Sequence, residues 1–310
     1  MRGMRIETVV RLFPETNMRS ARKDITILAL LSAATLALIC ILYRNIRYER
    51  LAAEADPYRL IGPTPEAVLA INQIDALSQF ILQREPLRAI FTEHIPHAFL
   101  SLIRTDLPLS SALIAYYPRG SILYAPMEQR IARRLFKHLD QAFAFPPQEG
   151  RDGPIHVSYY PDTNHRFLGC YYHKGLFVAS YNRRLLTQAI ERHVSDTASP
   201  LPELARITRR DTHVPLRLFL PSDSVHIHVP LEDSTLWHPR EPWLALDLFP
   251  SEGNLCCLNE QPCEAHTDTT LYQAISDTAQ AYVRRLFPML NTTTQISYDE
   301  TAVYYIICGH

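Results

Sequence analysis

Glycine is scarce in this sequence, and its scarcity excludes several classes of binding site. The chain has 9 glycines in 310 residues, against 23 prolines and 16 tyrosines. The phosphate-cradling loops G-x-G-x-x-G and the P-loop need clustered glycines that this chain does not have. No G-x-S-x-G, H-E-x-x-H or D-x-D pattern occurs either, and the first two are typical of serine hydrolases and zinc peptidases. We therefore predict no cofactor, assign no catalytic residue, and favour a protein that is not an enzyme.

Charge is absent from one long stretch, Ile25–Tyr43. As a helix its nineteen residues would span roughly 28 Å, close to the hydrocarbon thickness of a bilayer. A cleaved signal peptide is the alternative, but its apolar run is usually about 7–15 residues long and ends at small residues. Here the run is longer, and Tyr43 is followed by Arg44. The sequence favours an uncleaved, single-pass transmembrane helix over 25–43.

Positive charge is concentrated before the apolar stretch and predicts its orientation. The basic residues that precede it are Arg2, Arg5, Arg11, Arg19, Arg22 and Lys23. Arg44, Arg47 and Arg50 follow it and compete with them. The positive-inside rule favours a cytoplasmic N-terminus in the cell (inner) membrane, with the bulk of the chain extracytoplasmic. Because the whole chain has a formal charge of −1, residues 51–310 are mildly acidic, and we expect no nucleic-acid binding.

The remaining patterns predict four regions and one α+β ectodomain. The regions are a basic cytoplasmic tail (1–24), the transmembrane helix (25–43), a stem or linker (44–62) and an extracytoplasmic domain (63–310). Prolines at 57, 63 and 65 end the helical character of the stem. Short β-rich runs around tight turns, such as 111–117 and 121–126, predict a mainly antiparallel sheet with packed helices. The order strand, helix, hairpin occurs at 66–126 and at 243–309, which suggests two loosely similar units.

Four predicted strands contain adjacent tyrosines. The pairs are Tyr116 and Tyr117, Tyr159 and Tyr160, Tyr171 and Tyr172, and Tyr304 and Tyr305. Successive side chains of a strand point to opposite faces, so each pair should place one ring on either face of the sheet. Packing of the rings on the sheet faces is the simpler interpretation. An aromatic surface for a partner or glycan is the alternative.

The segment 256–266 holds the densest group of metal-ligating residue types. Cys263 and His266 have the side chains of a zinc site. Cys256 and Cys257 are adjacent on a predicted strand and point to opposite faces, so they do not easily share one metal. Outside the cytoplasm a disulfide from Cys257 to Cys263, or from Cys256 to Cys263, is a simpler interpretation. Buried free thiols are an equal alternative.

Two histidines, His226 and His228, alternate on a predicted strand and so share a face. Two such rings can bind a metal, but the sequence identifies no third or fourth ligand, and a solvent-facing strand edge is the simpler interpretation. His226, His228, Cys263 and His266 are therefore weak metal candidates. No catalytic, cofactor-binding or metal residue is assigned.

Three segments resemble a bacterial family of uncharacterised, single-pass membrane-anchored ectodomains. They are the opening Pro63–Asn72, the segment Gly175–Ser180 with the helix after it, and Trp243–Leu248 followed by Asn254–Asn259. The resemblance covers 25–310 loosely and departs at Glu260, where the family pattern has glycine. Since that family has no assigned activity, the resemblance implies location and architecture but no chemistry.

These observations predict a membrane-anchored extracytoplasmic protein with a non-enzymatic envelope interaction or structural role. Its expected partners are the lipid bilayer, through Ile25–Tyr43, and an envelope protein whose identity the sequence does not reveal. Two alternatives stay open. One is a hydrolase with an unrecognised site near His226 and His228, and the other is a module that binds a small ligand in an apolar pocket.

Overall fold

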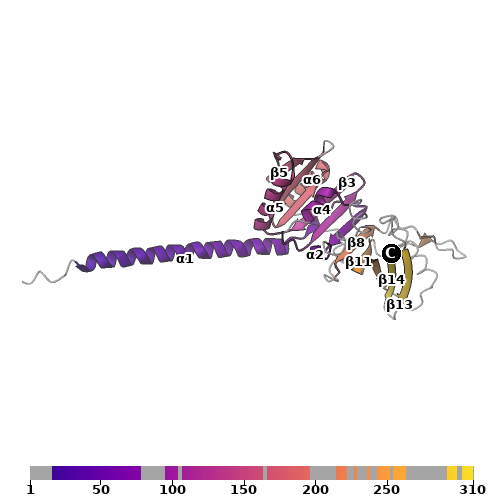
Figure 1. Cartoon of the computed structure of the whole chain (residues 1–310), viewed down its shortest axis with the longest axis horizontal. Helices are drawn as coiled ribbons and strands as arrows, with labels where there is room; N and C mark the ends of the chain where they lie inside the picture. Colours follow the sequence, from indigo (N-terminus) through magenta and orange to yellow (C-terminus); the bar gives the residue numbers. More distant parts are fainter. Residues whose placement is uncertain are drawn as a thin grey trace, which may run out of the picture. The chain divides into compact units, whose positions relative to one another are not determined.

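The computed structural model covers the 310-residue chain. The residues it describes are 16–77, 95–103, 107–162, 166–195, 214–221, 227–228, 236–237, 243–251, 254–262, 292–298 and 302–309. The chain divides into two compact units, Met1–Arg50 and Leu51–His310. Figure 1 shows the elements in chain order.

The described part of the first unit is a single helix, α1 (Thr16–Glu54), whose last turn belongs to the second unit. It contains the whole of the predicted apolar stretch and is drawn as one unbroken helix in Figure 1. Among the described residues it is the one helix long and apolar enough to cross a membrane, with a mean hydropathy of 2.4 over its most apolar part. The hydroxyls of Ser32 and Thr35 donate to the carbonyl oxygens of Leu28 and Leu31, at 2.8 and 2.7 Å. These polar groups are thus satisfied within the helix.

The second unit is built on one twelve-stranded sheet in the order β13-β14-β12-β11-β8-β1-β2-β3-β7-β6-β5-β4. Every neighbouring pair in that order is antiparallel. The strands are β1 (Ala67–Ile71), β2 (Ala112–Tyr117), β3 (Gly120–Pro126), β4 (Gln148–Asp152), β5 (Ile155–Pro161), β6 (Phe167–His173), β7 (Leu176–Ser180), β8 (Leu216–Pro221), β11 (Trp243–Ser251), β12 (Asn254–Pro262), β13 (Thr292–Tyr298) and β14 (Ala302–Gly309). Two short strands, β9 (Ile227–His228) and β10 (Leu236–Trp237), pair separately. The predicted α+β architecture with an antiparallel sheet is confirmed.

Helices cover both faces of the central strands. They are η1 (Pro57–Leu60, a 3-10 turn), α2 (Ile74–Ala76), α4 (His97–Ile103), α5 (Gln129–Ala142) and α6 (Arg183–Ser195). The apolar side chains of α4 and α5 pack in one buried cluster with Ile71, Ile114 and Phe177, which defines face 1 of the sheet. Those of α6 pack in a second cluster with Val68 and Tyr124, which defines face 2.

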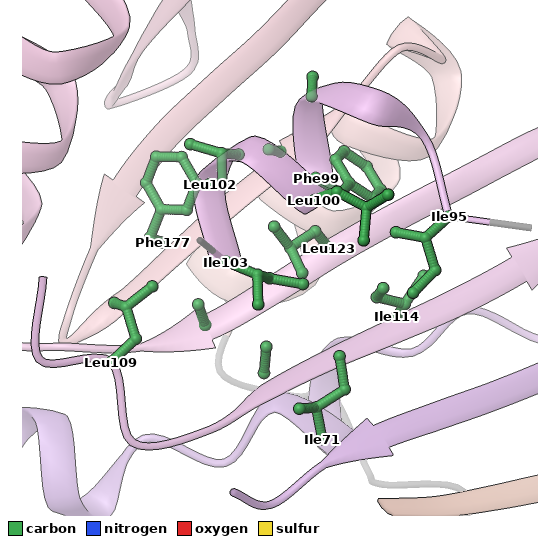
Figure 2. Packing of buried hydrophobic residues seen from close by; sticks show 14 of the residues in the cluster. Ile71, Ile95, Phe99, Leu100, Leu102, Ile103, Leu109, Ile114, Leu123 and Phe177 are labelled. Carbon is green, nitrogen blue, oxygen red and sulfur yellow. The ribbon is translucent and has the colours of Figure 1, made fainter. Parts of the chain in front are cut away.

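Face 1 shows why α4 forms where it does. Figure 2 shows Phe99, Leu100 and Ile103 of α4 directed toward Ile114 and Leu123 of the strands below. Phe99 and Ile114 are completely buried. Since an isolated seven-residue helix is not stable in water, burial of these side chains on the sheet is what stabilises α4.

The turn between β6 and β7 requires glycine for two reasons. Lys174 and Gly175 have positive φ angles of 41° and 84°. A Cβ atom on Gly175 would also lie 2.2 Å from the carbonyl oxygen of Leu51, so this turn closely approaches the last turn of α1. A side chain at position 175 would therefore be strained in its backbone and would collide with another backbone segment.

Asn182 begins α6, as its sequence position predicts. Its Oδ1 accepts hydrogen bonds from the backbone N–H groups of Arg184 and Leu185, at 3.0 and 3.3 Å. This is the standard N-cap arrangement and satisfies two otherwise unpaired donors.

Several sequence-based boundaries differ from the structure. The sheet unit begins at Leu51, earlier than the predicted domain start at 63, because residues of the predicted stem are buried in it. The two proposed repeat units also differ in strand order: β1 pairs with the first strand of the β2–β3 hairpin, whereas β12 separates β11 from the β13–β14 hairpin. The apolar periodicity of 271–290 also predicts a helix, but these residues lie outside the described ranges.

Candidate functional site

The segment between α1 and β1 is hydrogen-bonded to several other elements of the described chain. We call residues 56–62 the junction, because they lead from the apolar helix into the sheet. The junction begins with Asp56, whose Oδ1 accepts a hydrogen bond from the backbone N–H of Tyr58 at 3.0 Å. Pro57 occupies the first position of η1, where its missing N–H costs nothing. The proline that the sequence predicts as a breaker thus starts a tight helical turn.

Apolar side chains of the junction are buried on face 2. Leu60 and Ile61 are each 4% exposed and belong to the same cluster as Val68 and Phe219. The ring of Tyr58 packs edge-on against Phe219, with 6.3 Å between centroids. Burying an aliphatic side chain of this size contributes about 1.5–3 kcal/mol. Leu60 and Ile61, which the sequence predicts as part of a linker, therefore belong to the core.

Hydrogen bonds fix the backbone of the junction. The N–H of Gly62 donates to the Tyr117 hydroxyl oxygen at 2.7 Å. The Leu60 carbonyl oxygen accepts from the Tyr124 hydroxyl at 3.1 Å and from Nη1 of Arg192 at 3.5 Å. These three partners, one acceptor and two donors, come from β2, β3 and α6, so three elements of face 2 hold two consecutive peptide groups.

Glycine at position 62 is explained by this close approach. A Cβ atom there would lie 2.9 Å from the Tyr117 hydroxyl oxygen and 3.1 Å from Nη1 of Arg192. Any larger residue must displace one of these two groups. Position 62 therefore requires glycine because of these close contacts, and not because of its backbone conformation.

The phenols around the junction stay protonated at neutral pH. Burial raises the pKa of Tyr117 and raises that of Tyr124 well above its ordinary value. Burial also raises the pKa of Tyr58 to about 12, although the nearby Arg217 guanidinium opposes this shift. A phenol in this state donates or accepts a hydrogen bond but does not act as a base. These phenols therefore serve to hold the junction against the sheet.

A buried ion pair lies beside the junction on the same face. Arg217 of β8 and Asp247 of β11 are directly opposite in the sheet register. The guanidinium binds the carboxylate through two parallel contacts, Nε to Oδ1 and Nη2 to Oδ2, the second at 2.9 Å. The Arg217 side chain is 7% exposed and that of Asp247 20%. This bidentate pair specifies the register of β8 against β11. A shift of one residue would place the two side chains on opposite faces of the sheet, where each charge would lack its partner.

Two further polar groups lie elsewhere on the sheet. Near face 1, the Tyr181 hydroxyl donates to Asp162, and Arg166 lies 5.1 Å from the centre of the Tyr181 ring. At the end of α6, the rings of His173 and His193 meet edge to face, with 4.8 Å between centroids. Burial and the adjacent Lys174 lower the pKa of His173. Neither group places an activated nucleophile beside a base.

Of the four weak metal candidates, His228 alone lies among the described residues. His228 lies in β9 opposite Leu236, while Cys257 lies in β12 between Leu248 and Ile307. His226, Cys263 and His266 fall outside the described residues, so the predicted metal site and the predicted Cys257–Cys263 disulfide stay predictions. Within the described ranges no group of three or more His, Cys, Asp or Glu side chains could hold a metal ion.

The tyrosine pairs divide between the two faces as predicted. Tyr116, Tyr160 and Tyr172 pack on the face 1 cluster, and their neighbours Tyr117, Tyr159 and Tyr171 on the face 2 cluster. Packing, and not an exposed aromatic surface, is thus the role of these three pairs. The side chains of Tyr304 and Tyr305 are not among those the structure describes.

Sequence reasoning missed the ion pair and Arg192. The available signal was a single charge in each of two otherwise apolar strands, Arg217 in 214–221 and Asp247 in 243–250. A lone charge among buried residues needs a partner. For Arg192, which is one of several arginines in its helix, the sequence offers no comparable signal.

Comparison with known proteins gives no family. No family model matches the chain, and no curated protein does either. Crystal forms I, III and IV of TP0453 are similar solved structures, with TM-scores of 0.46, 0.44 and 0.44 and identities of 10%, 11% and 10%. The matches cover 82%, 83% and 82% of this chain and 92%, 94% and 92% of those chains. At such identities no residue role carries over.

Proposed function

We propose that this chain is a single-pass membrane protein whose ectodomain has a non-enzymatic interaction or structural role in the bacterial envelope. The observation that carries the proposal is the exposed apolar surface of α1. Large side chains such as Leu30, Leu36 and Ile39 are 68%, 63% and 55% exposed. Water is a poor solvent for so continuous an apolar surface, whereas a bilayer core suits it.

The polar atoms of α1 support the same proposal. A helix that crosses a bilayer must satisfy its own polar groups. Ser32 and Thr35 do so by donating to carbonyl oxygens one turn earlier. The helix also continues past the apolar stretch to Glu54, which favours an uncleaved anchor over a signal peptide.

The junction supports a structural role for the ectodomain. Its contacts attach the chain that leaves α1 directly to the sheet, with Leu60 and Ile61 buried only a few residues after the helix ends. We propose that the ectodomain presents its surface to an envelope protein. The positive charge before the helix favours a cytoplasmic N-terminus and an inner-membrane location. The resemblance to uncharacterised membrane-anchored ectodomains fits this arrangement.

The anchor is tested by placing charge within the apolar stretch. Replacing Leu31 and Leu36 by arginine should cost about 2.5–3.5 kcal/mol of insertion free energy per residue near the helix centre. We expect the double variant to leave the membrane pellet during an alkaline wash while the wild type stays. Phe145→Arg is the matched control, because Phe145 is 66% exposed outside this helix. Retention of the double variant in the membrane would contradict the proposal.

The interaction role is tested by crosslinking in intact cells followed by affinity capture of the full chain. We expect one protein to be recovered reproducibly, and to be lost when the anchor variant is used. Recovery of no partner in repeated captures would count against an interaction. Hydrolysis or ligand binding that depends on His226 or His228 would favour the alternatives that the sequence leaves open.

A further inference from the structure

Two cysteines lie directly opposite each other in the C-terminal half of the sheet. Cys256 of β12 pairs with Cys308 of β14 in an antiparallel register that runs without interruption from Leu255–Gly309 to Pro262–Ala302. The register of β12 is also fixed on its other side, where Cys256 pairs with Phe249 of β11. Of the six cysteines in the chain, these two are thus neighbours on adjacent strands although they are 52 positions apart in the sequence.

We propose that Cys256 and Cys308 form a disulfide that joins β12 to β14. Directly opposite residues of an antiparallel pair have Cα atoms about 4.5 or 5.5 Å apart, depending on whether the pair is hydrogen-bonded. Both spacings lie within the range of about 4.4–6.8 Å that a disulfide needs. Opposite residues also share a face of the sheet. The register therefore places the two Cα atoms within the distance that a disulfide spans.

The neighbouring cysteine is excluded from this bond by the same register. Cys257 pairs with Ile307 and Leu248, and it lies on the opposite face from Cys256 because adjacent residues of a strand alternate. A slip of one residue would pair Cys257 with Cys308 and would turn the whole of β12 over. The identity of the bonded cysteine thus reports the register of the strand.

The proposed disulfide would lie next to the row of the sheet that contains the ion pair. Asp247, which binds Arg217, pairs across the sheet with Leu258, and Leu258 pairs with Ile306. Cys256 and Cys308 occupy the next row on the same face. In one row the ion pair joins β8 to β11. In the adjacent row the disulfide would join β12 to β14.

The chemistry is thiol–disulfide exchange with an oxidised dithiol carrier or a small-molecule disulfide. One cysteine thiolate attacks the external disulfide, forms a mixed disulfide and releases one external thiolate. The other cysteine then attacks the mixed disulfide at the protein sulfur and releases the second external thiolate. Two protein thiols lose two protons and two electrons, and the external disulfide is reduced to two thiols. Because such oxidants act outside the cytoplasm, formation of the bond in cells rests on the extracytoplasmic location proposed above.

The test uses the full chain, from cells lysed directly into denaturing detergent that contains N-ethylmaleimide, so that buried free thiols such as Cys170 are blocked as well. The protein is then reduced and labelled with maleimide-PEG, so that each formerly bonded cysteine adds one mass step. We expect two steps in the wild type, in Cys257→Ser and in Cys263→Ser, and none in Cys256→Ser or Cys308→Ser. Trypsin digestion of the unreduced wild type provides a measurement without substitution. It cleaves at Arg240, Arg284 and Arg285, so a Cys308 bond joins two peptides, whereas a Cys257–Cys263 bond stays within one.

A second experiment tests the Cys256–Cys308 pairing separately from the extracytoplasmic location. A second sample, reduced in detergent and reoxidised with oxidised glutathione, tests the pairing without regard to compartment. Formation there of a two-peptide link that Cys256→Ser loses and Cys257→Ser keeps, with free thiols in cells, would support the pairing and contradict the extracytoplasmic location. A link within the Cys257–Cys263 peptide, or one from Cys257 to Cys308, would overturn the proposal. Failure of Cys256 and Cys308 to bond in the reoxidised sample would overturn it as well.

Discussion

Face 1 and face 2 of the sheet are covered in different ways. On face 1, α4 and α5 contribute apolar side chains such as Phe99 and Leu135, which are completely or almost completely buried. On face 2, α6 is joined by the junction, whose backbone is held by Tyr117, Tyr124 and Arg192. Apolar burial is non-directional and mainly provides stability, whereas hydrogen bonds to particular peptide groups specify position. Both faces are covered by buried apolar clusters, and face 2 differs in that its cover includes the junction, whose backbone is held by hydrogen bonds to particular side chains.

The largest effect is expected from the centre of face 1. Phe99→Ala removes a completely buried ring and leaves a cavity between α4 and the sheet, which should cost about 3–5 kcal/mol of unfolding free energy. Urea unfolding of the full chain in detergent, followed by tryptophan fluorescence, measures the change. Phe145→Ala, at a side chain that is 66% exposed, is the matched control and should unfold like the wild type. Equal effects of the two variants would contradict the assignment of face 1 as a stability core.

The ion pair on face 2 should give the next largest effect. Arg217→Ala leaves the Asp247 carboxylate, whose side chain is only 20% exposed, without its partner, and we expect a loss of about 3 kcal/mol. The double variant Arg217→Ala, Asp247→Ala should be less destabilised than the sum of the two single variants, because the second change removes the uncompensated charge. Additive losses would show that the two side chains act independently.

A smaller and more local effect is expected at the junction itself. Tyr117→Phe removes the hydroxyl that accepts from the Gly62 N–H and should cost about 1–2 kcal/mol. Hydrogen exchange should increase at the Gly62 amide while amides of α4 on face 1 keep their protection. Tyr159→Phe, on the same face, should leave the Gly62 amide unchanged. Increased exchange over both faces would mean that the junction is not a separate attachment.

The smallest effect concerns pH. The pKa of His173 is lowered by burial and by Lys174, so the folded chain favours the neutral ring. Below the ordinary pKa of 6.5 the unfolded chain binds the proton first, and stability falls as pH falls. His173→Gln should therefore reduce the loss of stability between pH 6.5 and more acidic values. An unchanged pH profile would contradict the lowered pKa.

The sequence predicted elements that rest on local patterns. Ile25–Tyr43 is uninterrupted by charge, Asn182 precedes an amphipathic helix, and residues 155–158 alternate between apolar and polar side chains. Each of these signals lies within the element that it predicts, and the structure contains all of them. By contrast β4 (Gln148–Asp152) has no apolar alternation, and residues 145–154 are predicted as a loop. It forms through polar pairs with other elements, such as Ser158 with Glu149 and Thr187 with Asp152.

The candidate site was the less predictable part because its contacts join distant segments. Leu60 and Ile61 sit among prolines, and prolines usually indicate a linker. Only the positions of Tyr124 and Arg192 show that these residues are held against the sheet. The Arg217–Asp247 pair likewise requires the strand order β11-β8, which a single sequence does not specify.

The most direct test of the account is protease protection in spheroplasts of cells that produce the chain with one epitope at each end. A cytoplasmic N-terminus and an extracytoplasmic sheet predict that added protease removes the C-terminal epitope without lysis. A membrane-bound fragment of α1 that carries the N-terminal epitope should survive until the membrane is dissolved. Survival of the C-terminal epitope in intact spheroplasts, or loss of the N-terminal epitope from the untreated protein by cleavage, would contradict the account.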